Sequence, residues 1–300
     1  MQRALVSLWA GCAAMLVVSS AAPADGQNWI ANEQAAVAQA RKANKPLVFF
    51  FRKNECSDKI DNRREAIAQA FRHPSVVALT QRHFVMCQTD AEVQTNLKRK
   101  LGAKILDVII TTPDGDVILK LPKADTTQPQ RIVEHLRSAA ASHVERVYRQ
   151  DVRPALLAES ARPADLRKAL TCARQLGLES ADADVVRLLR NDKLDAGVRD
   201  LAFDVLADFS TQASVAALLD QSERYPRANA ALRKCKPRAA AHLADELKGR
   251  TTPRFLRAYR ALAAICNTRA QPDEFWANAD DDARRREIDR VKALARSVEG

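Results

Sequence analysis

The sequence predicts an α/β domain followed by an all-α domain, and three observations carry this prediction. Short apolar or β-branched runs alternate with helical patterns up to about residue 149. Beyond Pro154 the strand patterns stop and only helical periodicity continues. In that second half, similar helical segments recur roughly every 30 residues, which is typical of stacked helical repeats. We therefore expect an α/β domain at 25–150 and a helical repeat domain at 151–300.

Residues 1–24 have the pattern of a secretory signal peptide. Arg3 supplies the positive charge, a mostly apolar stretch follows from 4 to 18, and Ala22-Pro23-Ala24 offers a small-residue cleavage site. The apolar stretch is interrupted and falls short of a full bilayer span. We expect a secreted or periplasmic protein with no membrane span after signal removal.

The chain is basic, with a formal charge of +11 that becomes +10 once Arg3 leaves. Its Lys and Arg residues are scattered among acids rather than clustered, which favours a solvated basic surface near anionic envelope components. Together with export, this argues against a nucleic-acid partner. No Cys–His cluster has zinc spacing, so we expect no metal and no other cofactor.

Four helical and four strand patterns fill the first half in the order α-β-α-β-α-β-β-α. The helices are expected at 35–43, 61–71, 91–101 and 128–149. The strands are expected at 47–51, 83–88, 107–112 and 117–121. The first strand has no polar residue, as expected of a strand covered on both faces. Pro113-Asp114-Gly115-Asp116 is a turn signal, so the last two strands should form a hairpin.

A further set of residues follows this element order at regular places: Trp29, Ala36, Ala40, Lys45-Pro46, Phe71-x-x-Pro74-x-Val76, Phe84-Val85, Asp90 and Pro113-Asp114-Gly115. In order and spacing they resemble the thioredoxin-like superfamily, and are most similar to its exported branch. The resemblance covers roughly residues 27–149 and implies a thioredoxin-like α/β fold for that region.

Three positions depart from the pattern that this resemblance implies. Cys56 occupies the place of the family's nucleophilic cysteine, but Lys59 replaces the resolving cysteine and Glu55 replaces the usual Trp. Leu106 falls where the family places a cis-proline. Because a non-proline cis bond costs about 2.5–4 kcal/mol, we expect the Ile105–Leu106 bond to be trans. The site is therefore a degenerate Cys-x-x-Cys site.

Two interpretations of Cys56 stay open. A thiol between a strand and a helix meets the helix N-terminus, which favours a thiolate, and Lys59 and Lys53 would add positive charge. This predicts a monothiol nucleophile that forms mixed disulfides. Alternatively, Cys56 is a relic in a binding scaffold, with Asp58 countering the positive field. Cys87 is either a buried apolar residue or a resolving thiol, and we expect it not to pair with Cys56 at rest.

After signal removal five cysteines remain, an odd number that leaves at least one thiol unpaired or paired with another molecule. Besides Cys56 and Cys87 these are Cys172, Cys235 and Cys266. We expect these three to be core or boundary thiols. A disulfide between two of them is the alternative in an oxidising compartment.

The second half repeats a simple pattern. An arginine opens an Ala/Leu-rich helical segment four times, at spacings of 32, 28 and 27 residues: Arg167, Arg199, Arg227 and Arg254. Second apolar segments lie between them at 185–189, 215–219 and 243–247, and a final helix is expected at 282–297. These pairs resemble short HEAT-like repeats, which implies stacked helix pairs with an extended surface for protein partners. Pro154 and Pro163 flank the expected domain boundary.

These observations together predict an exported protein with a degenerate thioredoxin-like site that acts as a protein-binding or scaffold module of the cell envelope. The alternative is a monothiol redox protein or thiol-disulfide oxidoreductase that acts through Cys56.

Overall fold

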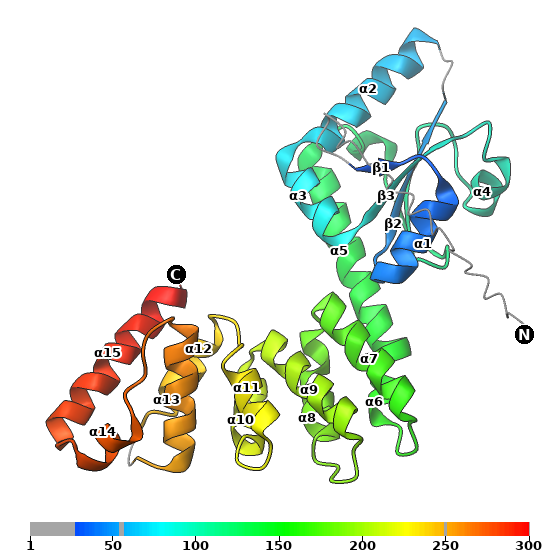
Figure 1. Ribbon diagram of the computed structural model, residues 1–300. Helices are drawn as coiled ribbons and strands as arrows, with labels where there is room; N and C mark the ends of the chain where they lie inside the picture. The colour runs from blue at the N-terminus through cyan, green and yellow to red at the C-terminus, as the bar shows by residue number, and fades with distance from the viewer. Residues whose placement is uncertain (1–27, 54–56, 249–250, 300) are drawn as a thin grey trace, which may run out of the picture.

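The computed structural model describes residues 28–53, 57–248 and 251–299, and it contains an α/β part followed by a helical part (Figure 1). The predicted signal peptide at 1–24 lies outside the described residues. Within the described residues, no helix is long and apolar enough to cross a membrane.

A mixed sheet of five strands forms the centre of the α/β part. Its strands are β1 (Trp29–Ile30), β2 (Leu47–Arg52), β3 (Val85–Asp90), β4 (Val108–Thr111) and β5 (Val117–Lys120). The order across the sheet is β1-β3-β2-β4-β5. β3 runs parallel to β2 and β1, whereas β4 is antiparallel to both β2 and β5. The four predicted strands are present, and the two-residue β1 is an addition that the sequence patterns did not indicate.

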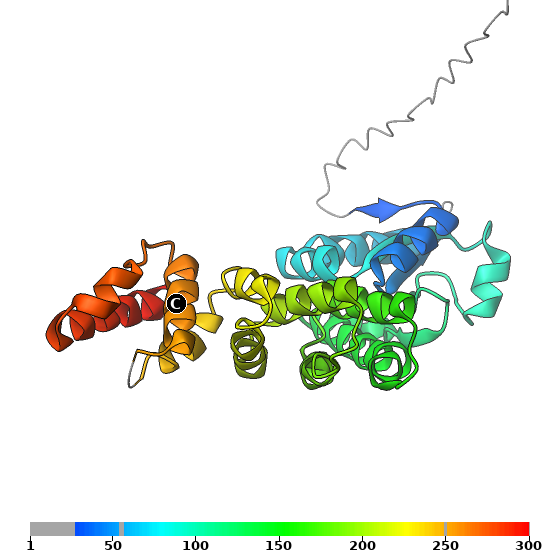
Figure 2. The ribbon, with the colours of Figure 1, turned by 60° about the horizontal axis from the view of Figure 1, so that its bottom comes forward.

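Helices cover both faces of this sheet (Figures 1 and 2). They are α1 (Glu33–Ala43), α2 (Asp58–Arg72), α3 (Pro74–His83), α4 (Thr95–Lys100) and α5 (Pro129–Val147). Side chains of α1 and α4 pack on one face, and those of α2, α3 and α5 pack on the other. Val48 and Phe50 of β2 point to the second face, while Leu47, Phe49 and Phe51 point to the first. All five are buried, which confirms the expectation of a strand covered on both faces.

One predicted boundary was wrong, and one helix was missed. The helix expected at 61–71 ends at Arg72, as predicted, but Pro74 then starts the additional helix α3, because a proline is well tolerated in the first turn of a helix. The helix expected at 91–101 begins only at Thr95. A turn precedes it, in which the Asp90 carboxylate accepts hydrogen bonds from the backbone N–H groups of Glu92 and Val93.

A continuous helical segment joins the two parts. α5 passes into a π-helical turn at Tyr148–Val152 and then into α6 (Arg153–Leu157). Pro154 lies in the first turn of α6, where its missing N–H interrupts the regular α-helical pattern, and the wider π turn accommodates it. The connection expected between Pro154 and Pro163 is therefore helical up to Leu157.

The helical part consists of two rows of helices that extend away from the sheet (Figures 1 and 2). One row contains α7 (Pro163–Leu176), α9 (Ala196–Phe209), α11 (Pro226–Leu232) and α13 (Pro253–Ile265). The other contains α6, α8 (Asp182–Leu188), α10 (Gln212–Gln221) and α12 (Ala239–Asp245). α14 (Asp273–Asn278) and α15 (Asp281–Glu299) follow, and α15 packs on α12 and α13. Each predicted arginine lies in one helix of the first row, and the predicted second segments form α8, α10 and α12.

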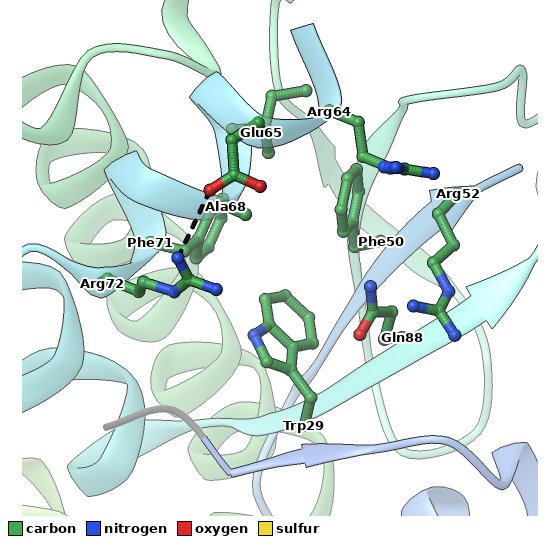
Figure 3. A pocket seen from close by; sticks show the side chains of 10 residues that line it. Trp29, Phe50, Arg52, Arg64, Glu65, Ala68, Phe71, Arg72 and Gln88 are labelled. Atoms are coloured by element: carbon green, nitrogen blue, oxygen red, sulfur yellow. Dashed lines mark hydrogen bonds and ion pairs between the residues drawn. The ribbon is translucent and has the colours of Figure 1, made fainter. Parts of the chain in front are cut away.

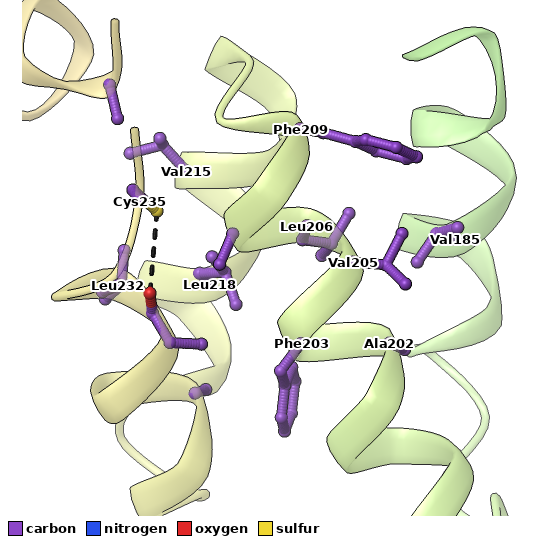
Figure 4. Packing of buried hydrophobic residues seen from close by; sticks show 14 of the residues in the cluster. Val185, Ala202, Phe203, Val205, Leu206, Phe209, Val215, Leu218, Leu232 and Cys235 are labelled. Atoms are coloured by element: carbon purple, nitrogen blue, oxygen red, sulfur yellow. Dashed lines mark hydrogen bonds between the residues drawn. The ribbon is translucent and has the colours of Figure 1, made fainter. Parts of the chain in front are cut away.

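One continuous apolar cluster runs through this part of the molecule. Figure 4 shows its central section, where α9 lies between its neighbours. Val205 of α9 lies on the side of Val185 in α8, while Leu218 of α10 and Leu232 of α11 complete the cluster on the other side. Each helix therefore buries its apolar face only against adjacent helices.

Ion pairs connect residues that lie about one repeat apart in the sequence. The pairs are Arg167–Asp195, Arg174–Asp208, Arg224–Asp192, Arg254–Asp220 and Arg257–Glu223. Two of the four recurrent arginines of the sequence, Arg167 and Arg254, belong to this set and so have a structural role.

Candidate functional site

The predicted nucleophile, Cys56, lies outside the described residues together with its two preceding neighbours. The residues on either side are described: β2 ends at Arg52, and Ser57 is the N-cap of α2. Lys59 is exposed in the first turn of α2, and its side chain makes no hydrogen bond or ion pair with another described residue. The roles of Cys56 and Lys59 therefore stay predictions.

Charged side chains at the end of β2 are paired with one another. The Lys53 ammonium lies 2.6 Å from a Glu92 carboxylate oxygen. Arg64 donates to the Lys53 carbonyl oxygen at 3.1 Å and also pairs with Asp61 at 3.1 Å. Because Glu92 shares the Lys53 charge, Lys53 has less capacity to stabilise a nearby thiolate than the sequence indicated.

The loop before β4 is held by backbone hydrogen bonds to the central strand. Leu106 donates its N–H to the Phe51 carbonyl oxygen at 2.7 Å, and Phe51 donates to the Asp107 carbonyl oxygen at 3.0 Å. Leu106 has φ 64°, a left-handed conformation that costs a non-glycine residue about 1–2 kcal/mol. The described residues contain no cis peptide bond, which confirms the expected trans bond before Leu106. Its N–H is already used inside the sheet.

Cys87 lies in the middle of β3, opposite Phe49 on one side and Ile30 on the other. Its side chain is fully buried, on the sheet face that α1 covers. Burial, with a smaller contribution from the Glu33 carboxylate, raises the pKa of its thiol to about 12. Since the thiolate is the attacking species, this environment favours the buried-apolar interpretation over the resolving-thiol interpretation. The resolving role itself stays a prediction.

The three cysteines of the helical part are also free thiols in the described structure. Cys235 is buried and points its thiol toward the Ala231 carbonyl oxygen, and burial raises its pKa to about 11. Cys172 accepts a hydrogen bond at 2.9 Å from the Asn44 side-chain amide, so it lies where α7 meets the α/β part. The alternative of a disulfide between two of these three cysteines is not what the structure adopts.

Near the end of β2, a cavity of about 320 Å³ lies between α2 and the sheet (Figure 3). Aromatic rings of Trp29, Phe50 and Phe71 form much of its wall, with the Trp29 ring centroid 6.0 Å from Phe50 and 5.6 Å from Phe71. Arg52 and Gln88 line it from β2 and β3. Figure 3 shows Arg72 and Glu65 of α2 paired across another part of its rim, at 3.3 Å.

Sequence reasoning missed this cavity. The signal that could have found it is alternation, because Phe50 and Arg52 are two residues apart and therefore point to the same face of β2. Gln88 pairs with Phe50 across the parallel strands, which places it on that face too. No pattern within a single segment shows that Trp29 and Phe71 close the same space.

Comparisons with known proteins place few constraints on this chain. No protein-family model matches it, and no curated protein matches its sequence. Among solved structures, it is similar to a disulphide isomerase from Xylella fastidiosa Temecula1, at 16% sequence identity and a TM-score of 0.26. That similarity covers 39% of this chain and 96% of the other.

Proposed function

We propose that the chain is an exported protein-binding or scaffold module of the cell envelope, with a thioredoxin-like domain at 25–150 and HEAT-like helical repeats at 151–300. A central β2 between a parallel β3 and an antiparallel β4, with helices on both faces, supports the thioredoxin-like assignment. The two rows of adjacent helices support the repeat assignment.

The observation that best supports this proposal is the complete burial of Cys87. Apart from Cys56 it is the only cysteine in the α/β region of the sequence. A dithiol cycle needs a second thiol that can approach and attack, and Cys87 is fully buried with its pKa raised to about 12. Lys59 stands where a second, exposed thiol would be needed. These features favour binding over dithiol exchange.

A reduction assay on insulin with a dithiol reductant tests this proposal. We expect the wild-type chain to add little to the rate of the reductant alone. The matched control is Lys59→Cys, which restores a Cys-x-x-Cys spacing and should raise the rate if the α/β domain can still exchange disulfides. Wild-type turnover near that of a dithiol thioredoxin would overturn the proposal.

A monothiol redox protein acting through Cys56 is the second candidate. It is favoured by the 15-residue α2, which begins two residues after Cys56 and whose N-cap residue Ser57 makes no side-chain capping hydrogen bond. Free N–H groups at a helix N-terminus favour an anion such as a thiolate. This candidate predicts that Cys56 alkylates faster than glutathione near neutral pH, and that Cys56→Ser abolishes mixed disulfides. Labelling at the glutathione rate counts against it.

A further inference from the structure

We propose that the cavity between α2 and the sheet is a binding site for a small organic carboxylate that carries an aromatic or branched apolar group. The cavity of about 320 Å³ lies at the small end of the range for ligand sites, and suits a molecule of roughly amino-acid size. The proposal rests on residues that no thiol chemistry uses, so it does not depend on the proposed function.

The carboxylate end is defined by two polar side chains, Arg52 and Gln88, that have no partner among the described residues. The Arg52 side chain makes no hydrogen bond or ion pair with another described residue, and its Nε is buried without an acceptor. Arg52 lines the cavity and its guanidinium has no carboxylate partner among the described residues, so a ligand carboxylate could pair with it. Arg52 pairs with Asp90 and Phe50 pairs with Gln88 along β2 and β3, so Arg52 and Gln88 are diagonal neighbours on one face.

The remaining charges at the cavity explain why one carboxylate fits better than a polyanion. Arg72 is paired with Glu65, and Arg64 is paired with Asp61 and with a backbone carbonyl. Arg52 is therefore the guanidinium whose charge no described carboxylate balances. A single planar anion matches one guanidinium, with which it can form two parallel hydrogen bonds. The Gln88 amide supplies a further donor beside it.

The apolar end is defined by the aromatic wall. Trp29 lies edge-on to Phe71, and Ile67 of α2 adds an aliphatic surface next to them. Figure 3 shows the Trp29 and Phe50 side chains facing the same space as Arg52 and Gln88. A ligand that joins a carboxylate to a phenyl or branched alkyl group would contact both ends at once. Neither a simple inorganic anion nor a neutral hydrocarbon would.

Calorimetric titration of the full chain with 3-phenylpropionate tests the proposal, with 3-phenylpropan-1-ol and propionate as comparison ligands. We expect 3-phenylpropionate to bind at least about tenfold more tightly than either, since each comparison ligand lacks one end. Arg52→Gln should weaken binding about tenfold or more, while Arg52→Lys should weaken it less. Arg137→Gln, which removes an exposed arginine from α5, is the matched control and should bind like wild type.

Two further results decide the outcome. Gln88→Leu should weaken binding of the carboxylate without weakening that of the alcohol, which keeps the test informative if Arg52→Gln does not fold. Circular dichroism of each variant establishes folding. Equal binding of acid and alcohol, absence of binding, or unchanged affinity in a folded Arg52→Gln variant would overturn the proposal.

Discussion

The α/β part and the helical part bury their apolar side chains in different ways. In the α/β part, β2 supplies the apolar clusters on both faces of the sheet, so one strand supports the whole domain. In the helical part, burial is divided among successive helices that contact only their neighbours. A destabilising change in β2 should therefore disturb the whole α/β part, whereas one near the end of the helical rows should stay local.

Truncating one buried phenylalanine in each part of the molecule should give the largest effects and tests this difference directly. Phe49→Ala in β2 and Phe255→Ala in α13 each remove a ring that is 2% exposed, and each should cost about 3–5 kcal/mol of unfolding free energy. The spatial pattern should differ. Hydrogen exchange should accelerate across all five strands for Phe49→Ala, but mainly in α12 to α15 for Phe255→Ala.

Each of these variants is the control for the other, since the same side chain is truncated in both. Exchange that accelerates throughout the helical part of Phe255→Ala would contradict the local behaviour. Exchange confined to β2 and β3 in Phe49→Ala would contradict the central role of that strand.

Leu106→Pro should cost about 3 kcal/mol or more. Proline fixes φ near −65°, whereas Leu106 has φ 64°, and proline would also remove the N–H that bonds to Phe51. The proline that the sequence resemblance implies at this position should therefore destabilise the α/β part. Chemical denaturation measures the effect, with Leu106→Met as the control expected to cost less than about 1.5 kcal/mol. A proline variant as stable as wild type would show that the loop tolerates another backbone conformation.

The regular elements of both parts were largely predictable from sequence, because they depend on local periodicity. The apolar run at 47–51 and the repeated arginine segments each carry their own signal, and the structure places strands and helices there. The short β1 was not predictable, since its two residues form a strand only by pairing with Met86 and Cys87 of β3. The π turn was missed too, because in the sequence Pro154 is equally compatible with the end of a helix.

The candidate site was less predictable, because its properties arise between segments. The sequence identified Lys53 as a positive charge, but its pairing with Glu92 depends on how the β3–α4 loop folds back. It identified Cys87 as a candidate thiol, but the raised pKa follows from complete burial under α1. That the Arg52 side chain has no partner among the described residues can be recognised only once its neighbours in the fold are placed.

Asp182→Asn tests whether hydrogen bonds between α8 and the start of α10 stabilise the helical part. The Asp182 carboxylate is nearly buried and accepts hydrogen bonds from the Thr211 and Ser214 hydroxyls at the start of α10. An amide replaces one acceptor with a donor, so we expect a loss of about 1–3 kcal/mol in unfolding free energy. Asp200→Asn, at an exposed position in α9, should change stability by less than about 0.5 kcal/mol. Equal effects in the two variants would remove the proposed role of Asp182.

The junction between the parts should respond to pH through His143. This buried histidine of α5 donates through Nε2 to the Asn44 carbonyl oxygen at 3.0 Å, and Asn44 in turn contacts Cys172 of α7. Burial lowers the pKa of His143; the Asn44 hydrogen bond opposes this in part, and the nearby Arg146 charge lowers the pKa further.

The sign of the effect follows from proton binding. In the unfolded chain His143 binds a proton near pH 6.5, whereas in the folded chain it does so only at lower pH. The free energy of unfolding therefore has its full value above about pH 6.5 and falls on acidification. The slope per histidine is at most about 1.4 kcal/mol per pH unit. His143→Gln should flatten the profile between pH 7 and 5, while His83, whose pKa is also lowered by burial, maintains part of it. An unchanged profile in His143→Gln would contradict this assignment.

The smallest effects are expected from the ion pairs between repeats. This follows if apolar contacts between neighbouring helices supply most of the stability of the helical part. Arg224 and Asp192 are 2.6 Å apart but largely exposed, so Arg224→Gln should cost at most about 0.5 kcal/mol. Arg254 is 36% exposed and pairs with both Asp220 and Glu246, contacting Glu246 through two nitrogens. Its replacement by Gln should cost more, about 1 kcal/mol, because a partly buried bidentate pair is screened less. Raising the salt concentration should reduce the smaller effect first. If Arg224→Gln proved as costly as Phe255→Ala, charge pairing rather than apolar contact would hold the repeats together.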